Sequence, residues 1–206
     1  MSKVIVANYT VSLDGYGAGP NQRLDQPFGD DAEVLHDWML IAMAARDRGE
    51  TGPGVDQLDR FRDGVGATIM GRNMFSPLRG AWADESWRGY WGENPPYHHA
   101  TFVHTHHLRP DLVMDGGTTF HFTDQPAAAV LDRAREAAGD QDIVVAGGAA
   151  TIRQYLDADL IDEIDLMVAP IFLGAGESPF GGDALKKFDV TDTVVLPRAT
   201  LYRLRR

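Results

Sequence analysis

The chain has 206 residues, 44% of them hydrophobic and 24% charged, which is ordinary for a folded domain with a substantial core. Thirty acidic residues against nineteen Lys and Arg give a net charge of −11, which disfavours binding to nucleic acid or to an anionic membrane. The lack of cysteine excludes disulfides and thiolate chemistry. Because there is neither a signal-peptide pattern nor an apolar run of about 20 residues, we expect a cytoplasmic protein with a single domain over residues 1–206.

Short runs of apolar and β-branched residues predict the strands. These runs are residues 4–11, 67–70, 101–103, 111–114, 118–122, 143–146, 164–170, 190–196 and 200–204. The early strands alternate with helical stretches, whereas the last two form a hairpin around Pro197. This order predicts an α/β fold with a mostly parallel sheet and an antiparallel C-terminal edge.

Apolar residues spaced three and four positions apart predict the helices. The first begins at Asp30-Asp31, and its apolar face consists of Leu35, Trp38, Met39 and Met43. Further helices are expected at residues 55–62, at 126–138 with Asp124 as the cap, and from Gly148 to about Leu156. The segments 15–30 and 76–100 are expected to be loops.

The strongest local signal is the run 142–151, in which a predicted strand ends at Gly147-Gly148 and a helix follows. Glycine lets a ligand approach the backbone, and the N–H groups and dipole of a helix N-terminus favour a phosphate group. A tight turn that requires a positive φ is the alternative interpretation, and it needs no ligand.

Two further signals lie at the ends of predicted strands. Arg72 follows Gly71 at the end of strand 67–70, where it either clamps a phosphate or is a surface residue that begins a helix. Asp14 lies in Ser-Leu-Asp-Gly after the first strand, where it either relays a proton or bonds its own backbone in a turn. Ligands of open α/β sheets lie at the carboxyl ends of the strands, so these signals point to the same edge of the sheet.

Histidines and tryptophans are concentrated in and after the irregular segment 76–100. No HExxH pattern and no cysteine accompany the histidines, so no metal site is expected from His98, His99, His104, His106 and His107. The tryptophans form either a substrate lid, a dimer contact or a hydrophobic cluster under a long loop, and the last is the simplest interpretation of Trp82, Trp87 and Trp91.

The order of the motifs resembles the dihydrofolate reductase-like superfamily: Ser-Leu-Asp-Gly at 12–15, Gly-Arg-x-x-Phe at 71–75, and Gly-Gly at 147–148 before a late helix. The segments 160–164 and 168–176 are similar to the reductase domain of the bacterial riboflavin-pathway deaminase–reductase and its stand-alone relatives. The resemblance covers essentially the whole chain. It implies a three-layer fold, with helices on both faces of the sheet and NADPH across the strand ends.

The resemblance also implies which residues bind NADPH. Thr105 and His106, helped by Arg109, would hold the 2′-phosphoribose, and Thr10 would lie near the nicotinamide. The adenosine-phosphate and pyrophosphate side would be lined by Gly71, Arg72, Asn73 and Met74. The pyrophosphate would also lie against Gly147, Gly148, Ala149, Ala150 and Thr151. An arginine near the 2′-phosphate favours NADPH over NADH.

The resemblance assigns a catalytic role to Asp14. It matches the acid near the substrate in riboflavin-type reductases, so we expect it to relay a proton or to orient the substrate. Folate reductases instead use a carboxylate on the first long helix, and no matching motif surrounds Asp30, Asp31 or Asp37. The zinc signature of the deaminase requires cysteine, so no deaminase activity is expected.

The leading hypothesis is therefore an NADPH-dependent reductase of a small heteroaromatic substrate, either pteridine-like or pyrimidine-like. One alternative is the 5-amino-6-(5-phosphoribosylamino)uracil reductase of riboflavin biosynthesis, although the sequence offers no clear set of basic residues for the substrate phosphate. The other alternative is a non-catalytic NADPH-binding protein. The resemblance also makes a homodimer plausible, with its contact expected at strand 165–169 and the tail 170–180.

Overall fold

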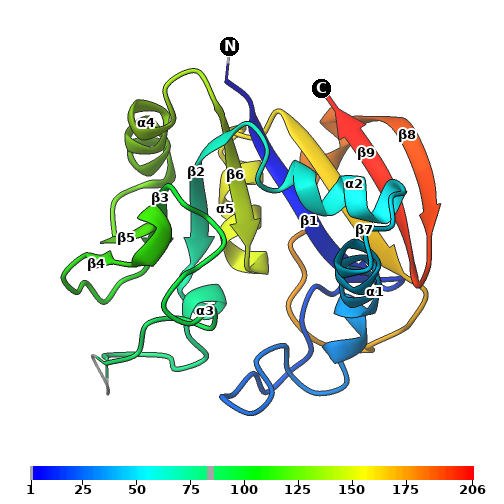
Figure 1. The fold of residues 1–206 in the computed structure, drawn as a ribbon, viewed down its shortest axis with the longest axis horizontal. Helices are drawn as coiled ribbons and strands as arrows, with labels where there is room; N and C mark the ends of the chain where they lie inside the picture. Colours follow the sequence, from blue (N-terminus) through cyan, green and yellow to red (C-terminus); the bar gives the residue numbers. More distant parts are fainter. Residues whose placement is uncertain (1, 83–85) are drawn as a thin grey trace.

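The computed structural model describes residues 2–82 and 86–206. These residues form a nine-stranded sheet with the strand order β4-β5-β3-β2-β6-β1-β7-β9-β8 (Figure 1). The strands are β1 (Val4–Ser12), β2 (Val65–Gly71), β3 (Ala100–His104), β4 (Leu112–Val113), β5 (Thr119–Thr123), β6 (Asp142–Gly147), β7 (Glu163–Ala169), β8 (Asp189–Leu196) and β9 (Ala199–Arg205).

The sheet is parallel in its centre and antiparallel at both ends. The six strands from β5 to β7 run in one direction. By contrast, β4 pairs antiparallel with β5, and β9 pairs antiparallel with both β7 and β8. This arrangement confirms the predicted fold class and adds β4 as an antiparallel strand at the opposite edge. β2 is buried along its whole length in the middle of the sheet, whereas β8 is an exposed edge strand.

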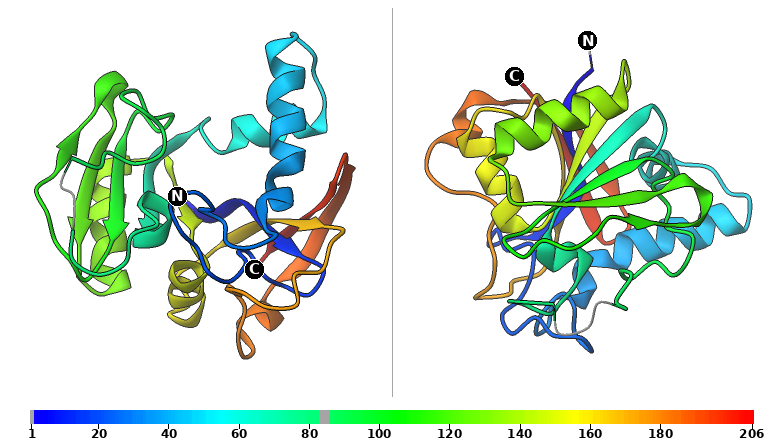
Figure 2. Two further views of the ribbon diagram at one scale, coloured as in Figure 1. Left: turned by 90° about the horizontal axis from the view of Figure 1, so that it is seen from below. Right: turned by 90° about the vertical axis from the view of Figure 1, so that its left-hand side faces the viewer.

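Helices cover both faces of the sheet, as expected (Figure 2). α4 (Ala127–Ala138) and α5 (Ala149–Asp157) pack on one face, and α4 buries residues at spacings of three and four, namely Ala127, Val130, Leu131, Ala134 and Ala138. On the other face lie α1 (Asp37–Asp47) and α2 (Pro53–Arg60), whose Trp38 and Leu58 share a cluster with Met167 of β7. The short α3 (Arg72–Phe75) follows β2 directly. Within the described ranges, no helix has both the length and the apolar character needed to cross a bilayer.

A buried ion-pair network holds α2 against β7 and β9. The side chain of Asp165 is fully buried, and its Oδ2 accepts hydrogen bonds from Arg60 Nε at 2.5 Å and Gln57 Nε2 at 3.2 Å. Its Oδ1 accepts a hydrogen bond from Arg205 Nη1 at 3.2 Å. Gln57 Nε2 also donates to Asn8 Oδ1 of β1 at 2.9 Å, so the network extends to the central strand.

Two local expectations are wrong. The first helix does not begin at Asp30-Asp31, because Asp31 has a φ of 58°, which no helix accommodates, and a 3₁₀ turn at Glu33–His36 precedes α1. Asp124 does not cap α4. The N-cap is Pro126, and no side-chain hydrogen bond caps the helix.

The structure also limits where a homodimer contact can form. β7 pairs with β1 on one side and with β9 on the other, so neither edge of this predicted contact strand is free. The segment 170–180 that follows it lies at the surface, and its Phe172 side chain is 75% exposed.

Candidate active site

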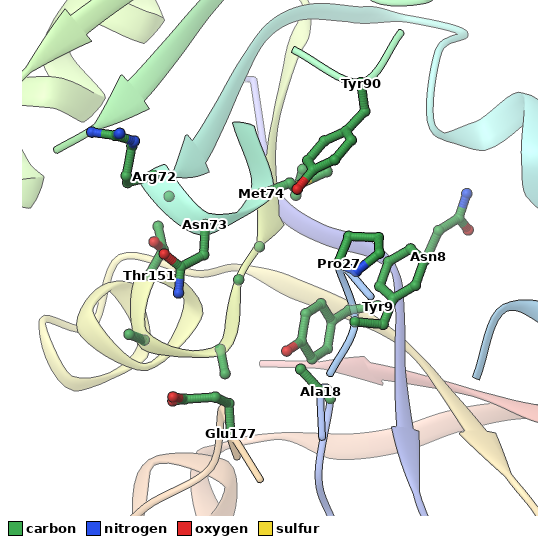
Figure 3. Close-up of a pocket in the computed structure, with 18 of the residues that line it drawn as sticks. Asn8, Tyr9, Ala18, Pro27, Arg72, Asn73, Met74, Tyr90, Thr151 and Glu177 are labelled. Atoms are coloured by element: carbon green, nitrogen blue, oxygen red, sulfur yellow. The ribbon is translucent and has the colours of Figure 1, made fainter. Parts of the chain in front are cut away.

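A cavity of about 1130 Å³ opens at the carboxyl ends of the central parallel strands. Residues 7–10 of β1 line it, together with the last residues of β2 (Gly71), β3 (His104) and β6 (Gly147). Ligand sites of open α/β sheets lie at this edge of the sheet. The glycine pair and Arg72, two of the three signals in the sequence, therefore meet in one cavity (Figure 3).

The turn between β6 and α5 forms one wall of the cavity. Gly147 has a φ of 132°, which favours glycine, and its peptide bond to Gly148 is cis. A Cβ built on Gly147 would lie 3.1 Å from the Tyr9 ring, whereas one built on Gly148 would have no atom within 4 Å. α5 begins at Ala149, and the first N–H groups of a helix have no carbonyl partner within it. The turn thus requires glycine for its backbone and also leaves open space beside unpaired N–H groups.

The guanidinium of Arg72 forms a second wall. It stacks on Trp82, with the guanidinium carbon 3.2 Å from the ring centroid, and its Nη1 donates to Gly80 O at 3.3 Å. Its Nε and Nη2 are buried without a hydrogen-bond partner among the described residues. Burial and the nearby charge of Arg109 lower the pKa of Arg72. Unsatisfied buried donors on a cation are costly, and an anionic group placed there would satisfy them.

The other residues that the resemblance assigned to NADPH lie around the same cavity, with one exception. The cavity is lined by Thr10, Asn73, Met74, Thr105, His106, Ala149, Ala150 and Thr151. Thr10 is fixed by a hydrogen bond from Trp38 Nε1 of α1 to its Oγ1 at 2.9 Å. The exception is Arg109, which does not line the cavity, although its guanidinium carbon lies 4.8 Å from the Trp82 ring that stacks on Arg72.

Asp14 is placed outside the lining of the cavity. Its carboxylate accepts hydrogen bonds from Ser12 Oγ at 2.5 Å, Leu173 N at 3.1 Å and Gly174 N at 2.7 Å. The Ser12 bond and the two backbone bonds stabilise the charged form and lower the pKa of Asp14. A carboxylate with this pKa is a poor proton donor near neutral pH. Its contacts are those of a residue that fastens the end of β1 to the loop after β7.

Tyr9 is a site residue that no motif in the sequence predicts. β1 has an irregular register against β7 between Val6 and Tyr9, and Asn8 has a φ of 57° within it. Bulges of this kind often re-aim side chains next to active sites. The Tyr9 ring lies in the cavity between Gly17 and Gly147, and a Cβ on Gly17 would collide with its hydroxyl. Burial, together with the charge of Glu177, raises the pKa of Tyr9 far above its usual value.

The three tryptophans of segment 76–100 belong to a hydrophobic cluster, as the simplest interpretation predicts, whereas residues 83–85 of the segment lie outside the described part of the chain. Trp82, Trp87 and Trp91 pack against the buried rings of Phe75 and Phe120. Trp87 Nε1 donates to Phe75 O at 2.9 Å, and Trp91 stacks on Phe120 with ring centroids 5.9 Å apart. Trp91 also lines the cavity, so this tryptophan contributes to the site as well as to the core. In the described part of the chain, no three His, Asp or Glu side chains are grouped so that they could hold a metal ion.

The mixed sheet, the glycine turn after β6 and the arginine after β2 together define a dihydrofolate reductase-like domain. More specifically, the chain belongs to the RibD C-terminal domain family, whose model matches residues 3–202. No curated protein matches the chain.

Solved structures share this fold. A putative riboflavin biosynthesis protein from Shewanella sp. PV-4 has a TM-score of 0.61 and 23% sequence identity, over 100% of this chain and 99% of that one. A diaminohydroxyphosphoribosylaminopyrimidine deaminase/5-amino-6-(5-phosphoribosylamino)uracil reductase from Thermotoga maritima has a TM-score of 0.58 and 14% identity, over 99% of this chain and 56% of that one. For RibD from Acinetobacter baumannii the TM-score is 0.56 and the identity 17%, over 100% and 58% of the two chains. The chain thus spans somewhat more than half the length of these last two proteins.

Proposed function

We propose that the protein is an NADPH-dependent reductase that transfers a hydride to a small heteroaromatic substrate. The observation that carries this proposal is that two buried donors of Arg72 have no partner among the described residues, in the same cavity as the glycine turn before α5. The N–H groups at the start of α5 and the open space beside Gly148 suit a pyrophosphate. Arg72, with Thr105 and His106 lining the same cavity, suits the 2′-phosphate that distinguishes NADPH from NADH.

The residues of the cavity suggest how the chain would assist the reaction. Bound NADPH supplies the hydride from its nicotinamide ring. Tyr9 lies beside Gly147, and its raised pKa means that the phenol keeps its proton near neutral pH. The hydroxyl would therefore donate a hydrogen bond to the substrate atom that gains negative charge, and a preorganised donor of this kind stabilises the transition state.

A second candidate function is 5-amino-6-(5-phosphoribosylamino)uracil reduction. It is favoured by the family match and by the name of the Thermotoga maritima neighbour. The distinguishing feature of that substrate is its phosphate, which requires a cationic site separate from the one proposed for NADPH.

Replacing Arg72 with alanine is expected to weaken NADPH binding about tenfold or more, because a hydrogen bond to a charged group contributes about 1.5–3 kcal/mol. NADH lacks the 2′-phosphate, so its affinity should change little. Fluorescence titration of the purified parent and variant with each nucleotide measures both effects.

The matched control is Arg135→Ala, which removes a half-exposed arginine of α4 that pairs with Asp132 and does not line the cavity. It should leave both affinities unchanged. Equal NADPH and NADH affinities in the parent, or an Arg72→Ala variant that retains the preference, would contradict the assignment. NADPH binding without oxidation by any substrate would instead favour a non-catalytic NADPH-binding protein.

We also propose that the protein forms a homodimer through the segment 170–180, which exposes Phe172, rather than through an edge of β7. We expect sedimentation to show a dimer for the parent protein and a monomer for Phe172→Ser. A variant that remains a dimer would place the contact elsewhere.

A further inference from the structure

We infer that the substrate is an uncharged, planar aromatic compound with a reducible carbonyl or imine group, recognised by its ring faces and not by a phosphate. This inference rests on the proposed NADPH-dependent reduction and specifies what the second half of the same cavity binds.

The half of the cavity away from Arg72 is lined by rings and thioethers. Figure 3 shows Tyr9, Pro27 and Tyr90 grouped apart from Arg72, with Met74 between them. Further aromatic and thioether side chains from four segments line the same cavity, namely Phe28, Met39, Met43, Phe61, Trp91 and Tyr97. Tyr97 has its ring centroid 6.0 Å from that of Phe61 and 5.1 Å from that of Trp91, so these rings form one continuous wall. Such walls stack on flat rings, and methionine adapts to ring systems of different outline.

Apart from Arg72, the arginines that line the cavity are already paired with acidic side chains. Arg62 Nη2 lies 3.2 Å and Arg46 Nη1 3.9 Å from the same oxygen of Asp59, and Arg79 Nη2 lies 3.6 Å from Glu177 Oε1. Two arginines share Asp59, which leaves one surplus positive charge at the rim of the cavity. All three arginine side chains are at least one-third exposed, so solvent screens this charge and a phosphate would gain little from it.

His36, which also lines the cavity, does not supply a positive charge for a substrate phosphate. Its ring stacks on Phe28 with centroids 3.8 Å apart, and burial lowers the pKa of His36 from 6.5 to about 4, despite the opposing charge of Asp37. The imidazole is therefore neutral near pH 7. The net charge of −11 adds a general repulsion of anions, which this half of the cavity does not offset locally.

The reaction balances as a two-electron reduction. The carbonyl or imine carbon gains the hydride, NADPH becomes NADP⁺, and the π electrons of the double bond move to the oxygen or nitrogen. That atom, hydrogen-bonded to the Tyr9 hydroxyl, then takes up a proton from solvent. The product is an alcohol or an amine on the same ring system.

A pair of probes with the same reducible group tests the inference. Isatin is an uncharged bicyclic ketone, and isatin-5-sulfonate adds one anionic group to the same ring. Quenching of protein fluorescence, to which Trp91 contributes from within the cavity, reports binding of each probe to the complex with NADP⁺, and NADPH oxidation reports turnover. We expect isatin to bind at least about tenfold more tightly, because the sulfonate must lose its hydration without a partner.

Two variants of α1 locate the binding. Met43→Ala should weaken isatin binding about fivefold by removing apolar contact area. Leu40→Ala, on the same helix but exposed and outside the cavity lining, should have no effect. Equal or tighter binding of the sulfonate, or no binding of isatin to the NADP⁺ complex, would overturn the inference. If neither NADPH nor NADP⁺ binds, the proposed function fails instead of this inference. The nucleotide titration of the parent protein and Arg72→Ala detects that failure independently of the isatin probes.

Discussion

Replacing Asp165 with alanine is expected to lower the free energy of unfolding by about 3–5 kcal/mol, the cost of removing one partner from a buried ion pair. Asp165 is fully buried and accepts hydrogen bonds from Arg60, Gln57 and Arg205. Its loss leaves Arg60 of α2 and Arg205 of β9 to share the carboxylate of Glu163. For a chain of this size the melting temperature should fall by roughly 10 °C, which thermal denaturation followed by circular dichroism measures.

The matched control is Asp192→Ala. Asp192 pairs with Arg203, whose Nη1 lies 3.1 Å from Asp192 Oδ2 and whose Nε lies 3.9 Å from Asp165 Oδ1, but the Asp192 side chain is 49% exposed. An exposed pair contributes about 0–1 kcal/mol, so this variant should melt close to the parent. If Asp165→Ala also melts within a few degrees of the parent, the network is not a major source of stability.

Replacing Gly148 with leucine is expected to abolish NADPH binding and leave the fold intact. A Cβ on Gly148 meets no atom within 4 Å, and its φ of −70° is accessible to any residue. The added side chain would instead fill the space proposed for the pyrophosphate. Losing two charge-assisted hydrogen bonds there costs about 3–6 kcal/mol, which is more than a hundredfold in affinity. Calorimetric titration with NADPH, together with the melting temperature, measures both parts of this prediction.

Gly181→Leu serves as the control, because a Cβ there makes ordinary contacts with Arg153 at 3.8 Å and the residue does not line the cavity. Its NADPH affinity should equal that of the parent. A stable Gly148→Leu protein that binds NADPH normally would show that the cofactor does not occupy the β6–α5 turn.

The fold and the meeting of two strand-end turns in one cavity could be predicted because their signals are local. A strand, a glycine pair and a helix follow one another over residues 142–151, and the strand end at Gly71-Arg72 is equally compact. Parallel strands bring such ends to one edge of a sheet whatever lies between them in sequence. The structure accordingly places both turns in one cavity.

The rest of the site depends on contacts that no short segment encodes. Tyr9 reaches the cavity after an irregularity in the register of β1 around Asn8. The sequence signals this irregularity only by placing the polar Asn8 within an apolar strand. The motif around Asp14 predicts a catalytic role for it. Its carboxylate binds the N–H groups of Leu173 and Gly174, about 160 residues along the chain, and local sequence contains no sign of this pairing.

The helix starts were mispredicted for a similar reason. Acidic residues before an apolar stretch favour an N-terminus, but the loop that contains Asp31 holds it at a positive φ. The 3₁₀ turn that follows then places His36 against Phe28, so one end of the substrate half is built by tertiary packing rather than by helix propensity.

Hydrogen–deuterium exchange with and without saturating NADPH tests the central claim most directly, because it shows where on the chain the cofactor lies. Binding in the proposed cavity predicts slower exchange in peptides that cover residues 71–75 and 147–153, with no change in the β8–β9 hairpin at residues 189–205. Unchanged exchange in both cavity segments at saturating NADPH, or protection confined to other parts of the chain, would contradict the account.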